Sequence, residues 1–223
     1  GVVGPVRTGK STFIKRFMDV AVLPYMEDAA QKTRAQDELP QSAGGRTITT
    51  TEPKFIPQEA VELKLAGEVT IRVRLVDCVG FMVEGAAGHL EDGAERLVKT
   101  PWYDHEIPFT QAAELGTRKV ITDHSTIGVV VTTDGSFSDL PQETYLDAEN
   151  QAISELKKLH KPFLVLVNSS HPSSRTAREA AERIEKQHSV AAMPVNCAQL
   201  SEEDIRQIME QILYEFPVSR VEF

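Results

Sequence analysis

The sequence predicts an α/β fold in which helices cover both faces of a mostly parallel sheet that carries one antiparallel hairpin strand. Three observations support this fold class. Short apolar runs alternate with longer stretches of helical periodicity through the C-terminal half, the pattern of parallel strands joined by crossover helices. Two runs of alternating polarity flank a three-residue turn with a central glycine, which indicates a hairpin. A glycine-rich loop separates the first apolar strand from the first helix.

The N-terminal half starts with a strand and a helix and then becomes less regular. Val2 and Val3 fit the end of a strand whose first half is missing, and apolar residues at helical spacing predict a helix over residues 11–23. The polar stretch 27–45, which contains Pro40, predicts a long loop. Further along, we expect two hairpin strands and then a region of loops with a short helix, over residues 60–65, 69–76 and 80–109 respectively.

The C-terminal half alternates regularly between apolar strands and helices. Its last predicted helix begins with Ser201 and Asp204 at the spacing of a capping box, in which each side chain satisfies a backbone amide of the other. The expected helices cover residues 110–121, 141–160, 174–187 and 201–214, and the expected strands cover 127–132, 163–167 and 193–196. Because a helix separates each of these strands from the next, we expect them to run parallel.

The composition is that of an ordinary globular protein, with 41% hydrophobic and 26% charged residues in a chain of 223. A net charge of −9 argues against bulk electrostatic binding to nucleic acid or anionic lipid. The longest apolar runs, such as residues 163–167, are too short to span a bilayer, and there is no signal-peptide pattern. Cys78 and Cys197 form neither a disulfide framework nor a metal motif. We therefore expect a cytoplasmic protein that binds no nucleic acid and does not insert into membranes.

Both ends of the chain have the features of a piece of a longer protein. The chain opens at Gly1 without an initiator methionine, and apolar alternation continues to Phe223. We expect one domain over residues 1–214, with its first strand truncated at Gly1, and the start of a following domain over residues 215–223.

The segment from Gly4 to Ser11 matches the pattern G-x-x-x-x-G-K-[ST] of a phosphate-binding loop, or P-loop. Glycines let successive backbone amides point at phosphate oxygens, and the helix that starts here adds the positive end of its dipole. Lys10 would reach the β and γ phosphates, and the Ser11 hydroxyl would ligate Mg²⁺. The nucleotide-binding residues predicted here are Gly4, Arg7, Thr8, Gly9, Lys10, Ser11 and Thr12.

A second motif, Asp77-Cys78-Val79-Gly80, closes the predicted inner strand of the hairpin. In switch-type NTPases an aspartate at this place holds Mg²⁺ through water, and the glycine amide senses the γ phosphate. Asp77 and Gly80 are therefore assigned these two roles. The spacing of this motif from the P-loop favours a P-loop NTPase of the switch-GTPase type.

A threonine cluster over residues 47–51 precedes the hairpin. Switch NTPases use a threonine in this region to ligate Mg²⁺ and to respond to the γ phosphate, and Thr50 and Thr51 lie nearest to the hairpin. The predicted metal ligands are thus Ser11, Thr50, Thr51 and Asp77. The predicted catalytic residues are Lys10, Thr50, Thr51, Asp77 and Arg7.

The predicted base-binding loop departs from that of GTPases. GTP-specific enzymes carry Asn-Lys-x-Asp after the next-to-last strand, whereas this chain has Asn168-Ser169-Ser170-His171. Asn168 matches the pattern, but an imidazole at His171 cannot reproduce the paired acceptance of the aspartate that reads guanine. We therefore predict ATP with Mg²⁺ as the bound nucleotide, and we include Asn168 and Gly80 among the nucleotide-binding residues.

These motifs do not identify the group that positions the attacking water. Phe81 occupies the place of the water-orienting glutamine of Ras-type enzymes, and a phenyl ring can only pack there. Arg7 lies within the P-loop, where a guanidinium can offset phosphate charge as an arginine finger in cis. The run Arg-Thr-Gly-Lys-Ser resembles the loop of guanylate-binding proteins, whose arginine swings inward on self-association. A solvated arginine, or one paired with an acidic neighbour, fits the sequence equally well.

Several long segments resemble the stage IV sporulation protein A family of endospore-forming Firmicutes. The resemblance extends over essentially the whole chain and is less distinctive at residues 172–200. It is carried by the runs VVGPVRTGKSTFIKRF (2–17), AQDELPQSAGGRTITTTEPKFIP (35–57), RLVDCVG (74–80), TPWY (100–103), GTRKVI (116–121) and HSTIGVVVTTDG (124–135).

This resemblance implies a morphogenetic ATPase of the translation-factor-related P-loop class. Such proteins gather at the outer forespore membrane in the mother cell, hydrolyse ATP and polymerise into the base layer of the spore coat. By matching motif, Lys10 would be the phosphate lysine and Asp77 the magnesium-side aspartate. Thr50 and Thr51 would be the sensor threonines. The family's middle and C-terminal domains, which carry contacts with other coat proteins and with a small forespore-membrane peptide, are absent here, so the chain resembles the ATPase domain alone.

Two other functions are compatible with these residues. A regulatory switch GTPase would signal to a partner by its nucleotide state, and a structural module would bind nucleotide without turnover. Base preference separates the first from an ATPase, and turnover that depends on Lys10 separates the second.

Overall fold

The computed structural model describes residues 1–40, 52–64, 70–86, 90–91 and 94–216. Its centre is a four-stranded sheet in which all neighbouring strands run parallel. In spatial order the strands are β1 (Val2–Val3), β8 (Gly128–Thr133), β9 (Phe163–Asn168) and β10 (Ala192–Val195). Strands β8 and β9 are buried along their whole length, as expected for inner strands covered on both faces. The predicted parallel sheet is confirmed.

The predicted hairpin is confirmed by two antiparallel strands, β2 (Lys54–Lys64) and β3 (Thr70–Asp77). Strand β2 begins at Lys54 rather than at residue 60, and an irregularity in the register separates its two paired parts. The chain after β3 continues beside the P-loop, where Phe81 N donates to Gly4 O at 3.0 Å and Val6 N donates to Phe81 O at 2.9 Å. The hairpin is therefore attached to the sheet at the edge where β1 lies.

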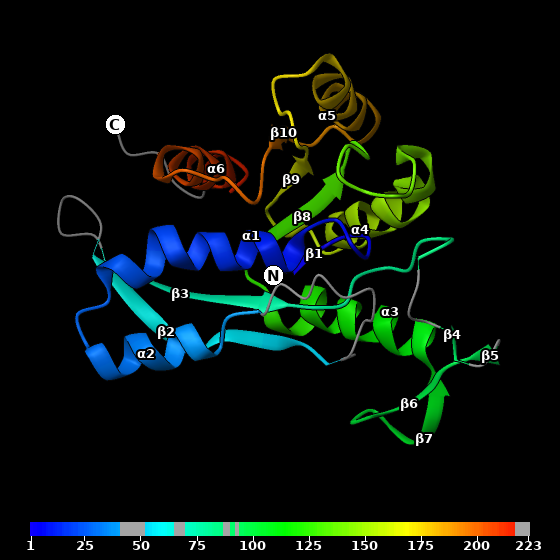
Figure 1. Ribbon diagram of the computed structural model, residues 1–223, viewed down its shortest axis with the longest axis horizontal. Coiled ribbons are helices and arrows are strands. Elements are labelled where there is room, and N and C mark those ends of the chain that lie inside the picture. The colour runs from blue at the N-terminus through cyan, green and yellow to red at the C-terminus, as the bar shows by residue number, and fades with distance from the viewer. Residues whose placement is uncertain (41–51, 65–69, 87–89, 92–93, 217–223) are drawn as a thin grey trace.

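Helices lie on both faces of the sheet, as predicted. They are α1 (Lys10–Phe17), α3 (Phe109–Lys119), α4 (Leu146–Lys158), α5 (Arg175–His188) and α6 (Glu202–Tyr214). Helices α1 and α6 share one hydrophobic core with alternate side chains of β8 and β9. Helices α4 and α5 and the turn that extends α3 share a second core with the intervening side chains. Figure 1 shows α1 on one side of β3 and α3 on the other.

Two of these helices continue into tighter or wider turns. π-Helical turns extend α1 over Met18–Val22 and α3 over Val120–His124, and 3-10 turns cover Leu23–Tyr25 and Gln142–Tyr145.

The four helices predicted after residue 109 and the three predicted strands between them are all present, with ends shifted by a few residues, as is usual for boundaries. Among the described residues, none of the helices combines the length and the apolar character that crossing a bilayer requires.

The prediction of a long loop over residues 27–45 is wrong in its first part, because helix α2 (Ala29–Asp37) forms there. Asp28 caps this helix by accepting hydrogen bonds from Ala30 N at 2.7 Å and Gln31 N at 3.1 Å. Ala35 is the buried residue of α2 and packs into the first core. With so few apolar residues, α2 lacks the periodicity that predicts a helix. The later part of the expected loop lies mostly outside the described residues.

The region expected to hold loops and a short helix, residues 80–109, instead forms small antiparallel pairs. They are β4 (Leu90–Glu91) with β5 (Ala94–Glu95), and β6 (Leu97–Thr100) with β7 (Tyr103–Pro108). Within the described part of this region, no helix precedes α3. The β6–β7 turn is made by Pro101 and Trp102, which is not one of the glycine turns that signal a hairpin. In Figure 1 this hairpin lies at one end of the molecule, beyond α3.

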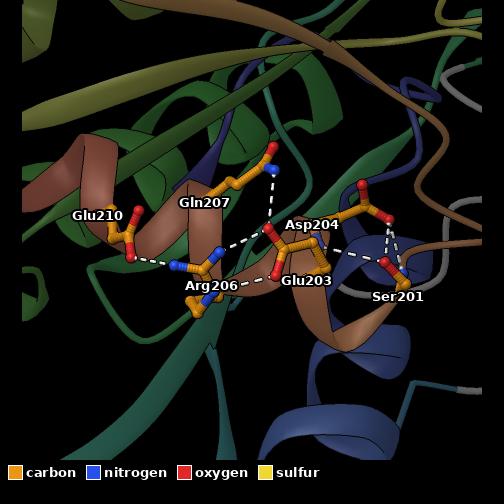
Figure 2. Close-up of polar contacts among 6 residues, drawn as sticks. All are labelled: Ser201, Glu203, Asp204, Arg206, Gln207 and Glu210. Atoms are coloured by element: carbon orange, nitrogen blue, oxygen red, sulfur yellow. Dashed lines mark hydrogen bonds and ion pairs between the residues drawn. The ribbon is translucent and has the colours of Figure 1, made fainter.

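Helix α6 begins with the predicted capping box, shown in Figure 2. Asp204 N donates to Ser201 Oγ at 3.2 Å, and Ser201 N donates to the Asp204 carboxylate at 2.8 Å. One turn further along, Arg206 forms ion pairs with Glu203 and Glu210 on the exposed face of the helix.

We expect Ser201→Ala to lower the free energy of unfolding by about 1 kcal/mol, since it leaves amides of the first turn of α6 without a cap. Arg206→Ala should have a smaller effect, because exposed ion pairs are screened by water. Urea unfolding of both variants measures the difference. An effect of Arg206→Ala as large as that of Ser201→Ala would contradict this account of the helix.

Candidate functional site

The P-loop between β1 and α1 is shaped by close contact with β8. Gly4 has φ of 128°, and a Cβ placed on it would lie 2.4 Å from the carbonyl oxygen of Val131, so only glycine fits there. Thr8 is fully buried, and its hydroxyl lies 2.6 Å from Val131 O and 3.0 Å from Pro5 O. The side chain of Thr8 therefore holds the loop onto the sheet. Because this hydroxyl is occupied, the loop would bind phosphate through its backbone amides.

The N-terminus of α1 and the side chain of Lys10 converge inside this loop. Gly9 is the N-cap residue of α1, so no side chain occupies the cap position where a phosphate would bind. Lys10 is 5% exposed, and its Nζ donates to Pro5 O at 2.5 Å. Burial lowers the pKa of Lys10, whereas the nearby groups of Cys78 and Asp77 act in the opposite direction. The loop thus encloses a cationic side chain with little access to water.

Ser11 and Asp77 meet at the start of α1, as the prediction of a shared metal site requires. Ser11 Oγ donates to Asp77 Oδ2 at 2.8 Å, and Asp77 Oδ1 accepts from Cys78 N at 2.9 Å. Burial raises the pKa of Asp77, and the charge of Lys10 opposes this shift. A hydroxyl and a carboxylate are oxygen ligands of the kind that Mg²⁺ prefers.

The rest of the proposed metal coordination would come from outside this pair. The described residues contain no cluster of three histidine, cysteine, aspartate or glutamate side chains that could hold a metal. Mg²⁺ bound here would therefore be shared with phosphate oxygens and water, as is usual for this ion. Thr50 and Thr51, the other two predicted ligands, lie outside the described residues.

Gly80 lies directly against the side chain of Lys10. It has φ of 102°, and a Cβ placed on it would lie 2.6 Å from Lys10 Nζ. Its amide donates to Thr117 Oγ1 at 3.1 Å, a contact that sequence reasoning missed. A signal for it exists in the sequence, since Thr117 is a polar residue on the apolar face of the predicted helix 110–121.

Asn168 connects the P-loop to the loop that follows β10. Its Nδ2 donates to Thr8 O at 3.0 Å, and its Oδ1 accepts from Cys197 N at 3.0 Å. Gly9 also packs against this amide, because a Cβ on Gly9 would lie 2.3 Å from Asn168 Nδ2. Both ends of the Asn168 side chain therefore brace the backbone of the site. A contact between Asn168 and the nucleotide stays a prediction.

The loops after β8 and β9 are tied together beside the P-loop. Ser170 N donates to Ser136 Oγ at 2.8 Å, and His171 N donates to Ser169 Oγ at 3.0 Å. Ser169 is 1% exposed, whereas His171 is exposed. Ser136 was missed by the sequence analysis, although its place just after a parallel strand is where ligand-binding residues gather in α/β folds. The short Ser169 side chain and the outward-facing His171 thus replace the lysine and aspartate of GTPases.

The structure also places three other residues discussed in the sequence analysis, Arg7, Thr12 and Phe81. Arg7 adopts φ of 61°, is exposed, and forms no hydrogen bond or ion pair with any described residue. Thr12 lies half-buried in the first turn of α1. Phe81 is 1% exposed and belongs to the second core, which confirms its interpretation as a packing residue.

Comparison with known proteins decides the family. The family described as "Stage IV sporulation protein A, ATPase domain" matches residues 1–217. The chain belongs to this family. Curated relatives named stage IV sporulation protein A are 49% identical in Clostridioides difficile (strain 630), 47% in Bacillus subtilis (strain 168) and 46% in Bacillus anthracis. Each match covers 99% of this chain and 45% of the relative, so the chain spans less than half the length of these proteins.

Membership in the stage IV sporulation protein A family confirms the resemblance inferred from the sequence motifs. The matched part of the family is its ATPase domain, which agrees with the P-loop, the buried Lys10 and the mostly parallel sheet. An ATPase domain also agrees with the presence of His171 at the position where GTPases carry a guanine-reading aspartate.

Proposed function

We propose that this domain binds Mg-ATP and hydrolyses it to ADP and phosphate, and that the nucleotide cycle switches the shape of a self-assembling sporulation protein. The observation that carries this proposal is the contact between Ser11 and Asp77 at 2.8 Å, beside the buried Lys10. Two segments far apart in the chain supply these groups, and together they match the phosphate and metal sides of a P-loop NTPase.

The described residues divide the work of hydrolysis between them. Lys10 and the P-loop amides would stabilise negative charge on the β and γ phosphates as water attacks in line. Ser11 and Asp77 would hold Mg²⁺, which neutralises phosphate charge when it is bound. We further propose that Thr50 and Thr51 respond to the γ phosphate, and that Arg7, with no partner among the described residues, is available to move toward the phosphates.

Adenine preference is supported by the loop after β9. The guanine-reading aspartate of GTPases accepts two hydrogen bonds from the base, and His171 offers at most one acceptor nitrogen. His171 is also exposed, while Ser169 is buried and occupied in accepting from His171 N. We therefore propose that this loop does not select guanine.

The role of the whole protein is proposed from the family. The relatives are named as sporulation proteins, and the chain matches 45% of their length. We propose that ATP hydrolysis drives polymerisation into the base layer of the spore coat, at the outer forespore surface in the mother-cell cytoplasm. Contacts with other coat proteins and with a small forespore-membrane peptide would be made by parts of the protein outside this chain.

Phosphate release from ATP and from GTP, each with Mg²⁺ and with excess EDTA, tests the proposal. We expect turnover of ATP about tenfold or more faster than turnover of GTP, and loss of both with EDTA. Faster GTP turnover would instead support a regulatory switch GTPase. Tight nucleotide binding without turnover would support a structural module.

A further inference from the structure

We propose that Thr117 is a positioning residue that competes with the γ phosphate for the amide of Gly80, and so lowers the preference of the site for ATP over ADP. This inference rests on the proposed function, because it requires that the site binds both nucleotides. It assigns a role to a side chain on α3, outside every motif that marks the nucleotide site.

The position of Gly80 makes its amide important for sensing phosphate. A Cβ on Gly80 would lie 2.6 Å from Lys10 Nζ and 2.3 Å from Gly4 O, so the backbone of Gly80 is packed between the phosphate lysine and the first glycine of the P-loop. A γ phosphate bound by Lys10 would therefore lie close to this backbone, where switch NTPases use the corresponding amide as a sensor.

The Thr117 side chain accepts a hydrogen bond from the buried amide of Gly80. The Gly80 N–H donates to Thr117 Oγ1 at 3.1 Å, and Thr117 Oγ1 donates its own hydrogen to Ala113 O at 2.8 Å. Thr117 is 0% exposed, and Gly80 is also buried. A buried amide without a partner is strongly disfavoured. In this structure the Thr117 hydroxyl provides the acceptor for the Gly80 amide.

The two acceptors exclude each other, because an amide has a single hydrogen. In the ADP complex the Gly80 amide can stay on Thr117, whereas in the ATP complex it would turn to the γ phosphate and leave the hydroxyl. The hydroxyl still keeps its bond to Ala113, so it loses only an accepted hydrogen bond. The Thr117 hydroxyl therefore stabilises the ADP complex relative to the ATP complex.

Replacing the hydroxyl by a methyl group tests this effect, because the contact of the same hydroxyl with the Cys78 thiol is lost in both complexes and cancels in their comparison. Thr117→Val keeps the shape of the side chain and removes the acceptor, which leaves the Gly80 amide unpaired in the ADP complex but not in the ATP complex. Thr117→Ser keeps the hydroxyl. Thr122→Val is the matched control, because Thr122 donates to a carbonyl one turn earlier in the same way, Arg118 O at 3.0 Å, but is exposed and is not the residue that accepts from Gly80 N.

The experiment measures the dissociation constants of Mg-ADP and of the non-hydrolysable β,γ-imido analogue of ATP by titration calorimetry. We expect the ratio of the ADP constant to the analogue constant to rise about tenfold in Thr117→Val. The ratio should stay within about twofold of the wild-type value in Thr117→Ser and Thr122→Val.

The outcomes separate this inference from the proposed function. A wild-type chain that binds neither nucleotide overturns the proposed function and this inference with it. A wild-type chain that binds both, with an unchanged or lowered ratio in Thr117→Val, overturns this inference alone. If Thr117→Val does not fold, methyl NMR of the wild type decides, since the Thr117 methyl signal must shift between the two complexes more than that of Thr122. Equal shifts overturn the inference.

Discussion

Lys10→Ala is expected to lower the rate of phosphate release from ATP about 100-fold or more, which is the size of effect seen when one preorganised charge-stabilising group is removed. Lys10 is only 5% exposed inside the P-loop, with Asp77 and Gly80 beside it. In such a place water cannot substitute for it, and so the loss of transition-state stabilisation should be large. Phosphate release at saturating Mg-ATP measures the effect.

Two further variants make this result specific. Lys10→Met keeps most of the length of the side chain without its charge, and should lose as much activity as Lys10→Ala. Lys15→Ala removes an exposed lysine from the same helix, and should leave the rate unchanged within about twofold. Urea unfolding of Lys10→Ala and Lys10→Met checks that both variants are folded, so that a lower rate reports the lost charge. Activity in Lys10→Ala within about tenfold of wild type would refute the assignment of the phosphate lysine.

Asn168→Ala is expected to lower the free energy of unfolding by about 3 kcal/mol, since it leaves two buried backbone groups without partners. Thr8 O would lose its donor and Cys197 N its acceptor, and neither site is open to water. The loss should also weaken ATP binding, because Thr8 lies within the P-loop. Urea unfolding measures the first effect, with an unchanged slope showing that the unfolded state is the same.

Asn196→Ala is the matched control for the brace. Asn196 lies in the next loop and also forms two backbone hydrogen bonds, to Ser170 O at 3.5 Å and from Ala198 N at 3.1 Å, but both are exposed. We expect Asn196→Ala to lower the free energy of unfolding by less than half as much as Asn168→Ala does. Asn168→Asp separates the two ends of the brace, because a carboxylate can accept from Cys197 N but cannot donate to Thr8 O. Equal stability of Asn168→Ala and wild type would show that the brace is dispensable.

The parts of the site that could be predicted from the sequence are those in which neighbouring residues act together. The P-loop needs its glycines, Lys10 and Ser11 in a fixed order, because consecutive amides must surround one phosphate. The Asp77 motif and the capping box of Ser201 are local in the same way, and the structure places the first at the end of β3 and the second at the start of α6, as expected. The parallel sheet followed from the alternation of strands and helices, which leaves few other arrangements.

Other features could not be predicted because their partners are distant or their signals are weak. Helix α2 is held by the cap at Asp28 and by little apolar surface, so no periodic pattern marks it. Hairpin β6–β7 turns at Pro101 and Trp102 without a glycine. Asn168 matched a base-reading motif by its position, but its observed bonds are to Thr8 and Cys197.

The sequence by itself determined the fold class, the phosphate loop and the family, because each of these is recorded in the order and spacing of adjacent residues. Only the tertiary structure decided which groups meet across the site. Thr117 accepts from the amide of Gly80 across 37 positions of the chain, and Asn168 donates to Thr8 O across 160 positions. The physical reason is that a buried polar group bonds to whatever partner the packed backbone brings within reach, and spacing along the chain does not record that partner.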